Sequence, residues 1–426
     1  MSCPIPRRFF GWKVMWAALV VAVFGWGVGF YGPPVFLYTL ATTRDWSISL
    51  VSAAVTTHYL VGAVIVASLP TVYRKLGLAP TTKASAVCLG LGMLGWAVAE
   101  APWQLFLATL VSGAGWAGTG AVAINTMIAT WFDRGRAKAL SVAYNGASVG
   151  GVLLTPIWVG LIAYGGLAMA AVAVGAIMIS VIWFLSDRYV ATTPTSMGTT
   201  IDGDPVVSTV VLNAGPQIAE RPGWTLWTSG TFVTYATGFT MGLFVQVGII
   251  AHLFSLLTRD LGLQGAGLAI GFATASAIAG RTLVGWFLLP TTDRRLVAAA
   301  TYLVQAVGCF VLAIAIGHSV PILLLGVLLF GIGIGNVTSL PPLIAQAEFA
   351  RADVARAIAL ATAIAQASYA FAPAAFGLLR EWPEAVAGSS HVTVFFTVAA
   401  GLQVMAAIIY GTGRHRHRRI RVAASD

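Results

Sequence analysis

One arginine inside a long apolar stretch is the residue of this sequence best suited to bind an anion. Residues 265–290 read GAGLAIGFATASAIAGRTLVGWFLLP and carry a single charge, at Arg281. The stretch is long enough to cross a bilayer as a helix, which takes about 20 residues. At about 1.5 Å per residue, Arg281 would lie roughly 12 Å inside the membrane. A cation there costs at least about 2.5–3.5 kcal/mol, and arginine keeps its proton, so we expect it to hold an anionic ligand.

The alternative for Arg281 is a structural role. Its guanidinium could bond carbonyls at a helix end or stack on an aromatic ring. None of the 14 acidic residues falls inside an apolar run, so the sequence offers it no fixed carboxylate there. Thr274, Ala277 and Gly285 share its helix face, and these small residues leave room for a ligand. A bidentate bond between arginine and a carboxylate would be strong in so dry a setting.

Four further polar residues inside apolar runs are secondary candidates for the binding site. His58 falls in the second run, Asn145 in the fifth, Tyr235 in the seventh and Gln366 in the eleventh. A neutral histidine is tolerated in a helix bundle and could gain a proton as an anion arrives beside it. For each residue the alternative is helix packing, because polar and small residues hold membrane helices together.

The composition is that of an integral membrane protein. Of 426 residues, 58% are hydrophobic and 9% are charged, whereas a soluble domain carries about 25% charge. The net charge of +10 lies in short loops and in the tail, which argues against a nucleic-acid partner. The three cysteines show no metal-binding spacing. We therefore expect no metal, no cofactor and no enzyme activity.

Twelve apolar runs predict the fold class. Only helices and closed barrels satisfy backbone polar groups in lipid, and these runs lack the alternation of barrel strands. The sequence therefore predicts an all-α fold of twelve transmembrane helices. The runs cover roughly residues 14–40, 49–70, 84–100, 104–131, 138–163, 166–186, 226–256, 265–289, 295–317, 320–347, 355–380 and 391–411.

The loop charges predict the orientation. With both termini in the cytoplasm, only Arg44, Arg259 and Arg380 of the 24 lysines and arginines lie on the opposite side. This asymmetry follows the positive-inside rule. We expect a multi-pass, monomeric protein of the inner (cytoplasmic) membrane, with the lipid bilayer as its surroundings.

Residues 187–225 interrupt the apolar pattern with several prolines and glycines. They predict a flexible cytoplasmic linker between a bundle of residues 1–186 and a second bundle of residues 226–413. The basic tail, residues 414–426, is expected to be disordered.

The two predicted bundles also look alike in sequence. RAKALSVA, starting at Arg136, follows the fourth run, and RAIALATA, starting at Arg356, follows the tenth. Parallel repeats of six helices are typical of one large class of transporters.

Four stretches are similar to one transporter family: Gly11-Trp12, Asp45-Trp46-Ser47, WFDRGRAKALSVAYNGASVG at residues 131–150, and Gly280-Arg281. They resemble the major facilitator superfamily, and within it the monocarboxylate transporter and oxalate–formate antiporter branch. The resemblance implies two pseudo-symmetric six-helix bundles, a central site between them, and transport of small organic acids. Animal monocarboxylate carriers have an aspartate where Ala277 stands, and oxalate-type carriers have a lysine where residues 357–379 hold no cation. A single buried cation suits one carboxylate better than two.

The sequence thus predicts a secondary transporter that moves a small organic anion by alternating access. A monocarboxylate is the first candidate for this anion. Arg281 would bind the carboxylate, and either a co-transported proton or an exchanged anion would couple its movement. The rival prediction is an exporter of uncharged amphiphilic or drug-like compounds. The chain lacks the G-P-x-x-G-G element typical of proton antiporters that expel drugs, which weakens that rival.

Overall fold

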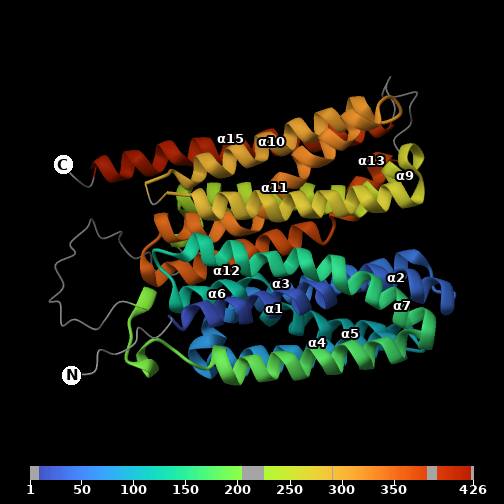
Figure 1. Ribbon diagram of the computed structural model, residues 1–426, viewed down its shortest axis with the longest axis horizontal. Coiled ribbons are helices and arrows are strands. Elements are labelled where there is room, and N and C mark those ends of the chain that lie inside the picture. The colour runs from blue at the N-terminus through green and yellow to red at the C-terminus, as the bar shows by residue number, and fades with distance from the viewer. Residues whose placement is uncertain (1–8, 204–224, 290, 381–390, 424–426) are drawn as a thin grey trace, which may run out of the picture. The chain divides into compact units, whose positions relative to one another are not determined.

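Long apolar helices make up nearly all of the chain that the computed structural model describes, which is residues 9–203, 225–289, 291–380 and 391–423 (Figure 1). No strand occurs in these ranges. By its internal contacts the chain divides into two units, residues 1–217 and 218–426. Each unit is described separately below as unit 1 and unit 2.

Unit 1 holds the first six spans. α1 packs along α7, and α4 packs along α5. α7 contains two spans, because Gly165 and Gly166 leave the helical conformation and Gly166 has a positive φ of 78°. The helices are α1 (Gly11–Gly29), α2 (Gly32–Thr43), α3 (Ile48–Leu76), α4 (Leu78–Val98), α5 (Pro102–Thr119), α6 (Ala121–Trp131) and α7 (Arg136–Leu185).

Unit 2 holds the other six spans. α9 packs along α11, and α10 packs along both α11 and α15. α9 again contains two spans, which separate at Gly262, where φ is +66°. The helices are α8 (Thr225–Thr228), α9 (Gly230–Phe287), α10 (Arg294–Ala315), α11 (Val320–Glu348), α12 (Arg351–Tyr369), α13 (Ala372–Arg380) and α15 (His391–Ala423).

The predicted number of spans is confirmed for the described chain. Ten stretches are long and apolar enough to cross a membrane. One of them, Arg136–Val190, contains the two spans of α7, and the 21-residue α4, which is not among these ten, completes the twelve predicted spans. The first span is broken between α1 and α2, just before Pro33 and Pro34. Proline has no backbone N–H to donate, so Pro33 and Pro34 cannot bond the carbonyls of Gly29 and Phe30 four residues earlier, which accounts for the break.

Part of the predicted linker contains regular secondary structure. Residues 204–224 lie outside the described chain. Residues 187–203 are folded: η1 (Ser186–Val190) continues α7, and two short turns follow, η2 (Thr195–Met197) and η3 (Ile201–Gly203). Asp187 forms an ion pair with Lys83 at the start of α4. This part of the predicted linker therefore belongs to unit 1.

The helix of the last span extends into the basic tail within the described residues. α15 does not end near residue 413 but continues to Ala423. Residues 414–423 read RHRHRRIRVA and contain neither glycine nor proline. Arginine is a good helix former, so nothing in this stretch stops a helix that has already begun in the preceding span.

Candidate functional site

Arg281 lies in the second span of α9 and is buried, with 3% of its surface exposed. Its Nε donates a hydrogen bond of 2.9 Å to the backbone oxygen of Gly335 in α11. The hydroxyls of Thr338 and Ser339 donate to the same oxygen, each over 3.3 Å. The bond to Gly335 uses one of the five N–H donors of the guanidinium and orients the group beside α11. It is a carbonyl contact of the kind that the structural alternative predicted, but it is made in the middle of a helix.

Glycines allow α9 and α11 to approach closely enough for this bond. A Cβ atom added to Gly335 would lie 2.3 Å from the oxygen of Ala277 and 2.7 Å from the Cβ of Arg281. A Cβ added to Gly280 would lie 2.2 Å from the oxygen of Ile332. The two backbones therefore touch with no side chain between them, as small residues permit in membrane helices.

We expect Gly335→Ala to push α11 away from α9 and to lengthen the bond to Arg281. Overpacking of this kind typically costs about 1–3 kcal/mol. Thermal unfolding of the purified protein in detergent should show the loss. Gly271→Ala is the matched control on α9, because nothing lies within 4 Å of the position of its Cβ. Equal stability of the two variants would contradict the close approach.

His58 is fully buried in unit 1, and both of its ring nitrogens are engaged. Nε2 lies 3.0 Å from the oxygen of Gly29, and Nδ1 lies 2.8 Å from Oγ of Ser112. A carbonyl can only accept, so Nε2 carries the proton and, in the neutral ring, Nδ1 accepts from the Ser112 hydroxyl. The indole N–H of Trp96 donates to the same Ser112 oxygen over 3.1 Å. These bonds tie together α1, α3, α4 and α5.

The position of Gly29 at the end of α1 explains why its carbonyl requires a donor from another helix, which His58 provides. Gly29 is the last residue of α1, so its carbonyl lies among those that find no donor within the helix. The neighbouring Tyr59 donates its hydroxyl to the oxygen of Phe30 over 2.9 Å. Together the two side chains satisfy the carbonyls at the break in the first span. This arrangement supports the packing explanation for His58 over a role in binding.

His58→Leu is expected to destabilise the protein without changing its affinity for substrate. The substitution leaves buried polar groups of Gly29 and Ser112 without this partner, at about 1–3 kcal/mol. Tyr59→Phe, which removes one hydrogen bond, should cost about 0.5–1.5 kcal/mol. Thermal unfolding tests the stability of both variants. The substrate concentration that half-saturates transport, measured per folded molecule, tests the affinity. A His58→Leu protein of normal stability that lost the pH dependence of transport would restore His58 to the binding site.

Tyr235 is fully buried in the first span of α9. Its ring contacts those of Phe232 and Phe349, with centroids 6.3 and 5.8 Å away. Both neighbours belong to unit 2. Packing within that unit therefore accounts for the burial of Tyr235.

Other residues on the same face of α9 also contact helices of unit 2. A Cβ atom on Gly242 would lie 2.2 Å from the ring of Tyr302 in α10. Gln246 accepts a hydrogen bond of 3.5 Å from Nε2 of Gln305, also in α10. This face packs against a neighbouring helix, which is the alternative that the sequence left open for polar and small residues.

The two remaining candidates lie in different units. Gln366 is buried in α12 of unit 2, and Asn145 is half-buried in α7 of unit 1. Arg281 and Tyr235 share unit 2 with Gln366, while His58 shares unit 1 with Asn145. The roles of these residues in binding stay predictions.

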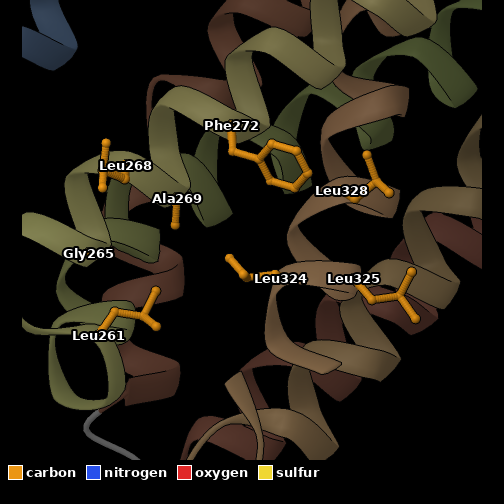
Figure 2. Close-up of a pocket in the computed structure, with 8 residues that line it drawn as sticks. All are labelled: Leu261, Gly265, Leu268, Ala269, Phe272, Leu324, Leu325 and Leu328. Carbon is orange, nitrogen blue, oxygen red and sulfur yellow. The ribbon is translucent and has the colours of Figure 1, made fainter. Parts of the chain in front are cut away.

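An apolar cavity of about 460 Å³ lies near Arg281 in sequence but is unsuited to an anion (Figure 2). It opens between α9 and α11, and Leu268 at its rim is 76% exposed. No lining side chain can pair with a charge, so a carboxylate here would lose its hydration without compensation. The lining residues are Leu261, Gly265, Leu268, Ala269, Phe272, Leu324, Leu325 and Leu328.

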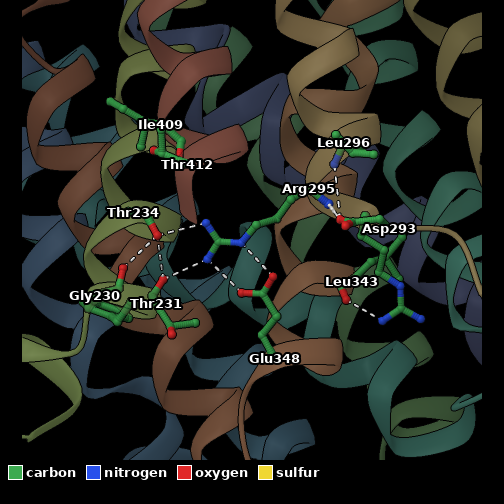
Figure 3. Close-up of polar contacts among 12 residues, drawn as sticks. Gly230, Thr231, Thr234, Asp293, Arg295, Leu296, Leu343, Glu348, Ile409 and Thr412 are labelled. Carbon is green, nitrogen blue, oxygen red and sulfur yellow. Dashed lines mark hydrogen bonds and ion pairs between the residues drawn. The ribbon is translucent and has the colours of Figure 1, made fainter. Parts of the chain in front are cut away.

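The structure shows another buried arginine, at the first residue of the predicted run 295–317, that the sequence did not single out. Arg295 is 1% exposed and forms a bidentate ion pair with Glu348, over 2.7 and 2.8 Å (Figure 3). It also donates to the oxygen of Thr231 and to Oγ1 of Thr234, each over 2.9 Å. Its charge has a fixed partner within the protein, which indicates a structural role at the junction of α9, α10 and α11.

The sequence contains one signal for this arrangement. Asp293 caps α10 by accepting hydrogen bonds from the backbone N–H groups of Arg295 and Leu296, over 3.1 and 3.4 Å (Figure 3). An aspartate directly before an apolar run is a helix-start signal. It places Arg295 in the first turn of the helix.

Comparison with known proteins identifies the family. The family model described as Major Facilitator Superfamily matches residues 15–373. The crystal structure of the human organic anion transporter MFSD10 (TETRAN) is similar, with a TM-score of 0.65, 13% identity, and coverage of 95% of this chain and 100% of that one. So is the structure of the proton:xylose symporter XylE bound to 6-bromo-6-deoxy-D-glucose, with a TM-score of 0.72, 15% identity and 94% coverage of each chain. At these identities the likeness concerns the fold alone, and comparison with curated proteins by sequence gives no match. The chain belongs to the major facilitator superfamily, whose members are membrane transporters and not enzymes.

Proposed function

We propose that this transporter moves a small organic anion, with a monocarboxylate as the first candidate, and that Arg281 binds the carboxylate. The supporting observation is the guanidinium itself, buried within a membrane span and held by the oxygen of Gly335. This bond positions the guanidinium beside α11. An arriving carboxylate could accept charge-assisted hydrogen bonds from it.

Cargo would cross by alternating access, as transporters built from repeats do. An anion that enters with a proton and an anion that exchanges for another both keep the charge of the site balanced. The names of the two similar structures point to different cargo, an organic anion for one and a proton with xylose for the other. The anion class therefore rests on Arg281.

The decisive experiment is a substrate screen on the purified protein in liposomes. Labelled monocarboxylates, dicarboxylates, sugars and amphiphilic dyes would be offered with and without a pH gradient, and with and without an anion inside. We expect saturable uptake of monocarboxylates, and the gradient that drives it identifies the coupling. Transport of sugars or dyes alone would overturn the proposal.

One observation favours the second candidate, an exporter of uncharged amphiphiles. The apolar cavity between α9 and α11 has a volume in the range of small-molecule sites, about 300–1,000 Å³, and its walls suit a hydrocarbon group (Figure 2). The same screen separates the two candidates. Filling the cavity with Ala269→Phe should abolish dye transport if the second candidate holds and leave carboxylate uptake unchanged if the first holds.

A further inference from the structure

We propose that the connection between the two units starts with a clamp, in which the carboxylate of Asp202 fastens residues 187–203 to the cytoplasmic end of unit 1. The carboxylate fills an anion-binding turn formed by residues 133–135, between α6 and α7. Residues 187–203 then move as part of unit 1 during transport. This role of Asp202 does not depend on which substrate the protein carries.

Three consecutive backbone N–H groups converge on Asp202. Its Oδ1 accepts from Asp133 over 3.1 Å and from Gly135 over 3.5 Å, and its Oδ2 accepts from Arg134 over 2.9 Å. Successive N–H groups of this kind form a concave site for anions. The site also lies at the N-terminus of α7, where the helix dipole favours negative charge. Only 13% of the Asp202 side chain is exposed, so the turn largely encloses it.

The side chain of Arg134 adds a weaker contact. Its Nε lies 3.5 Å from Oδ2 of Asp202, but the arginine side chain is 70% exposed. Exposed ion pairs contribute little in water. The backbone N–H groups are therefore the main part of the clamp, and the sequence of the turn matters less than its shape.

The backbone of the connection is bent so that the carboxylate reaches the turn. Asp202 has a φ of +64°, a left-handed conformation that is uncommon outside glycine and is better tolerated by aspartate than by most residues. Gly203 follows with a φ of +80°, and a Cβ atom there would lie 2.6 Å from the ring of Phe9. The bend thus has two specific partners in unit 1, the turn and Phe9.

An aromatic cluster lies beside the clamp. Phe9 contacts Phe132 and Trp131, with ring centroids 5.3 and 5.9 Å away. Phe10 contacts Tyr189 of η1 at 6.0 Å. The start of the described chain, the end of α6 and the residues after α7 are therefore joined at one place. The carboxylate of Asp202 fastens residues 187–203 beside this cluster.

Spin-label mobility tests the clamp directly. A nitroxide would be attached at Met197→Cys, an exposed position within the clamped residues, after Cys3, Cys88 and Cys309 are replaced by alanine. In the otherwise native protein in liposomes we expect an immobilised spectrum. Asp202→Ala should lose the immobilised component. Asp202→Asn should lose part of it, because its amide oxygen can still accept hydrogen bonds.

Two controls separate the clamp from general effects. Arg134→Ala keeps the backbone N–H groups and should retain the immobilised spectrum. Asp204→Asn removes a charge two residues away and should also retain it. Size-exclusion chromatography and thermal unfolding would establish that each variant is folded. An unchanged spectrum in folded Asp202→Ala, or equal loss in Asp204→Asn, would overturn the inference.

Discussion

Arg281→Ala should lose anion transport by about 100-fold, while the protein still folds and inserts into the membrane. A charge-assisted bidentate bond in a dry site contributes about 3 kcal/mol, and each 1.4 kcal/mol is a factor of ten. Insertion should not suffer, because the substitution removes a cation whose transfer into lipid is costly. Uptake of labelled monocarboxylate into liposomes, measured per folded molecule, tests the prediction.

Two companion variants sharpen the result. Arg281→Lys keeps the positive charge but not the planar, forked guanidinium, so it should also lose transport if bidentate geometry matters. Arg259→Ala removes an exposed arginine from the same helix, α9, and should transport normally. Uptake by Arg281→Ala that matches that of Arg259→Ala would refute the role assigned to Arg281. Loss in the alanine variant alone would show that charge, not shape, is what the site requires.

Glu348→Ala should cause the largest loss of stability. The substitution leaves Arg295 charged and buried without its ion-pair partner, which typically costs about 3–5 kcal/mol. Its other bonds, to Thr231 and Thr234, are to neutral oxygens and cannot offset the charge. The thermal unfolding temperature and the yield of monodisperse protein in detergent provide the measurement.

The chain offers a matched control in unit 1. Lys83 and Asp187 also form an ion pair, but the aspartate side chain is more than half exposed. Asp187→Ala should therefore cost only about 0–1 kcal/mol. The double variant Arg295→Met with Glu348→Leu should recover most of the stability that Glu348→Ala loses, because neither charge is then left buried alone. A Glu348→Ala protein as stable as Asp187→Ala would contradict the cost expected from leaving Arg295 buried without its partner.

Arg281 and Arg295, both buried in unit 2, bind different kinds of oxygen. Arg295 has a carboxylate of the protein at 2.7 Å. Arg281 has the neutral oxygen of Gly335 at 2.9 Å, which orients it. We expect the variants of Glu348 and Arg295 to report on folding and the variants of Arg281 to report on transport. Variants of Arg295 that retained stability but lost transport would break this distinction.

The sequence alone was sufficient for the class, the number of spans and the family. Each depends on information local to the chain: an apolar run of about 20 residues must form a helix in lipid wherever it lies. Contacts between residues far apart in the chain were not predictable in this way. Within the predicted linker, Asp202 finds its hydrogen-bond donors 67 to 69 residues earlier in the chain, and no local pattern shows such a partner.

The partners of buried polar residues were decided only by the tertiary structure. His58 meets Gly29 and Ser112, which lie 29 and 54 residues away, and Arg281 meets Gly335, 54 residues away. Arg294 and Arg295 are neighbours of the same type, yet Arg295 is the one bound to Glu348. Such pairings depend on how each helix is rotated and how closely two helices approach. Those quantities come from packing over the whole unit, so the sequence could show that polar groups are buried but not which partner each one would meet.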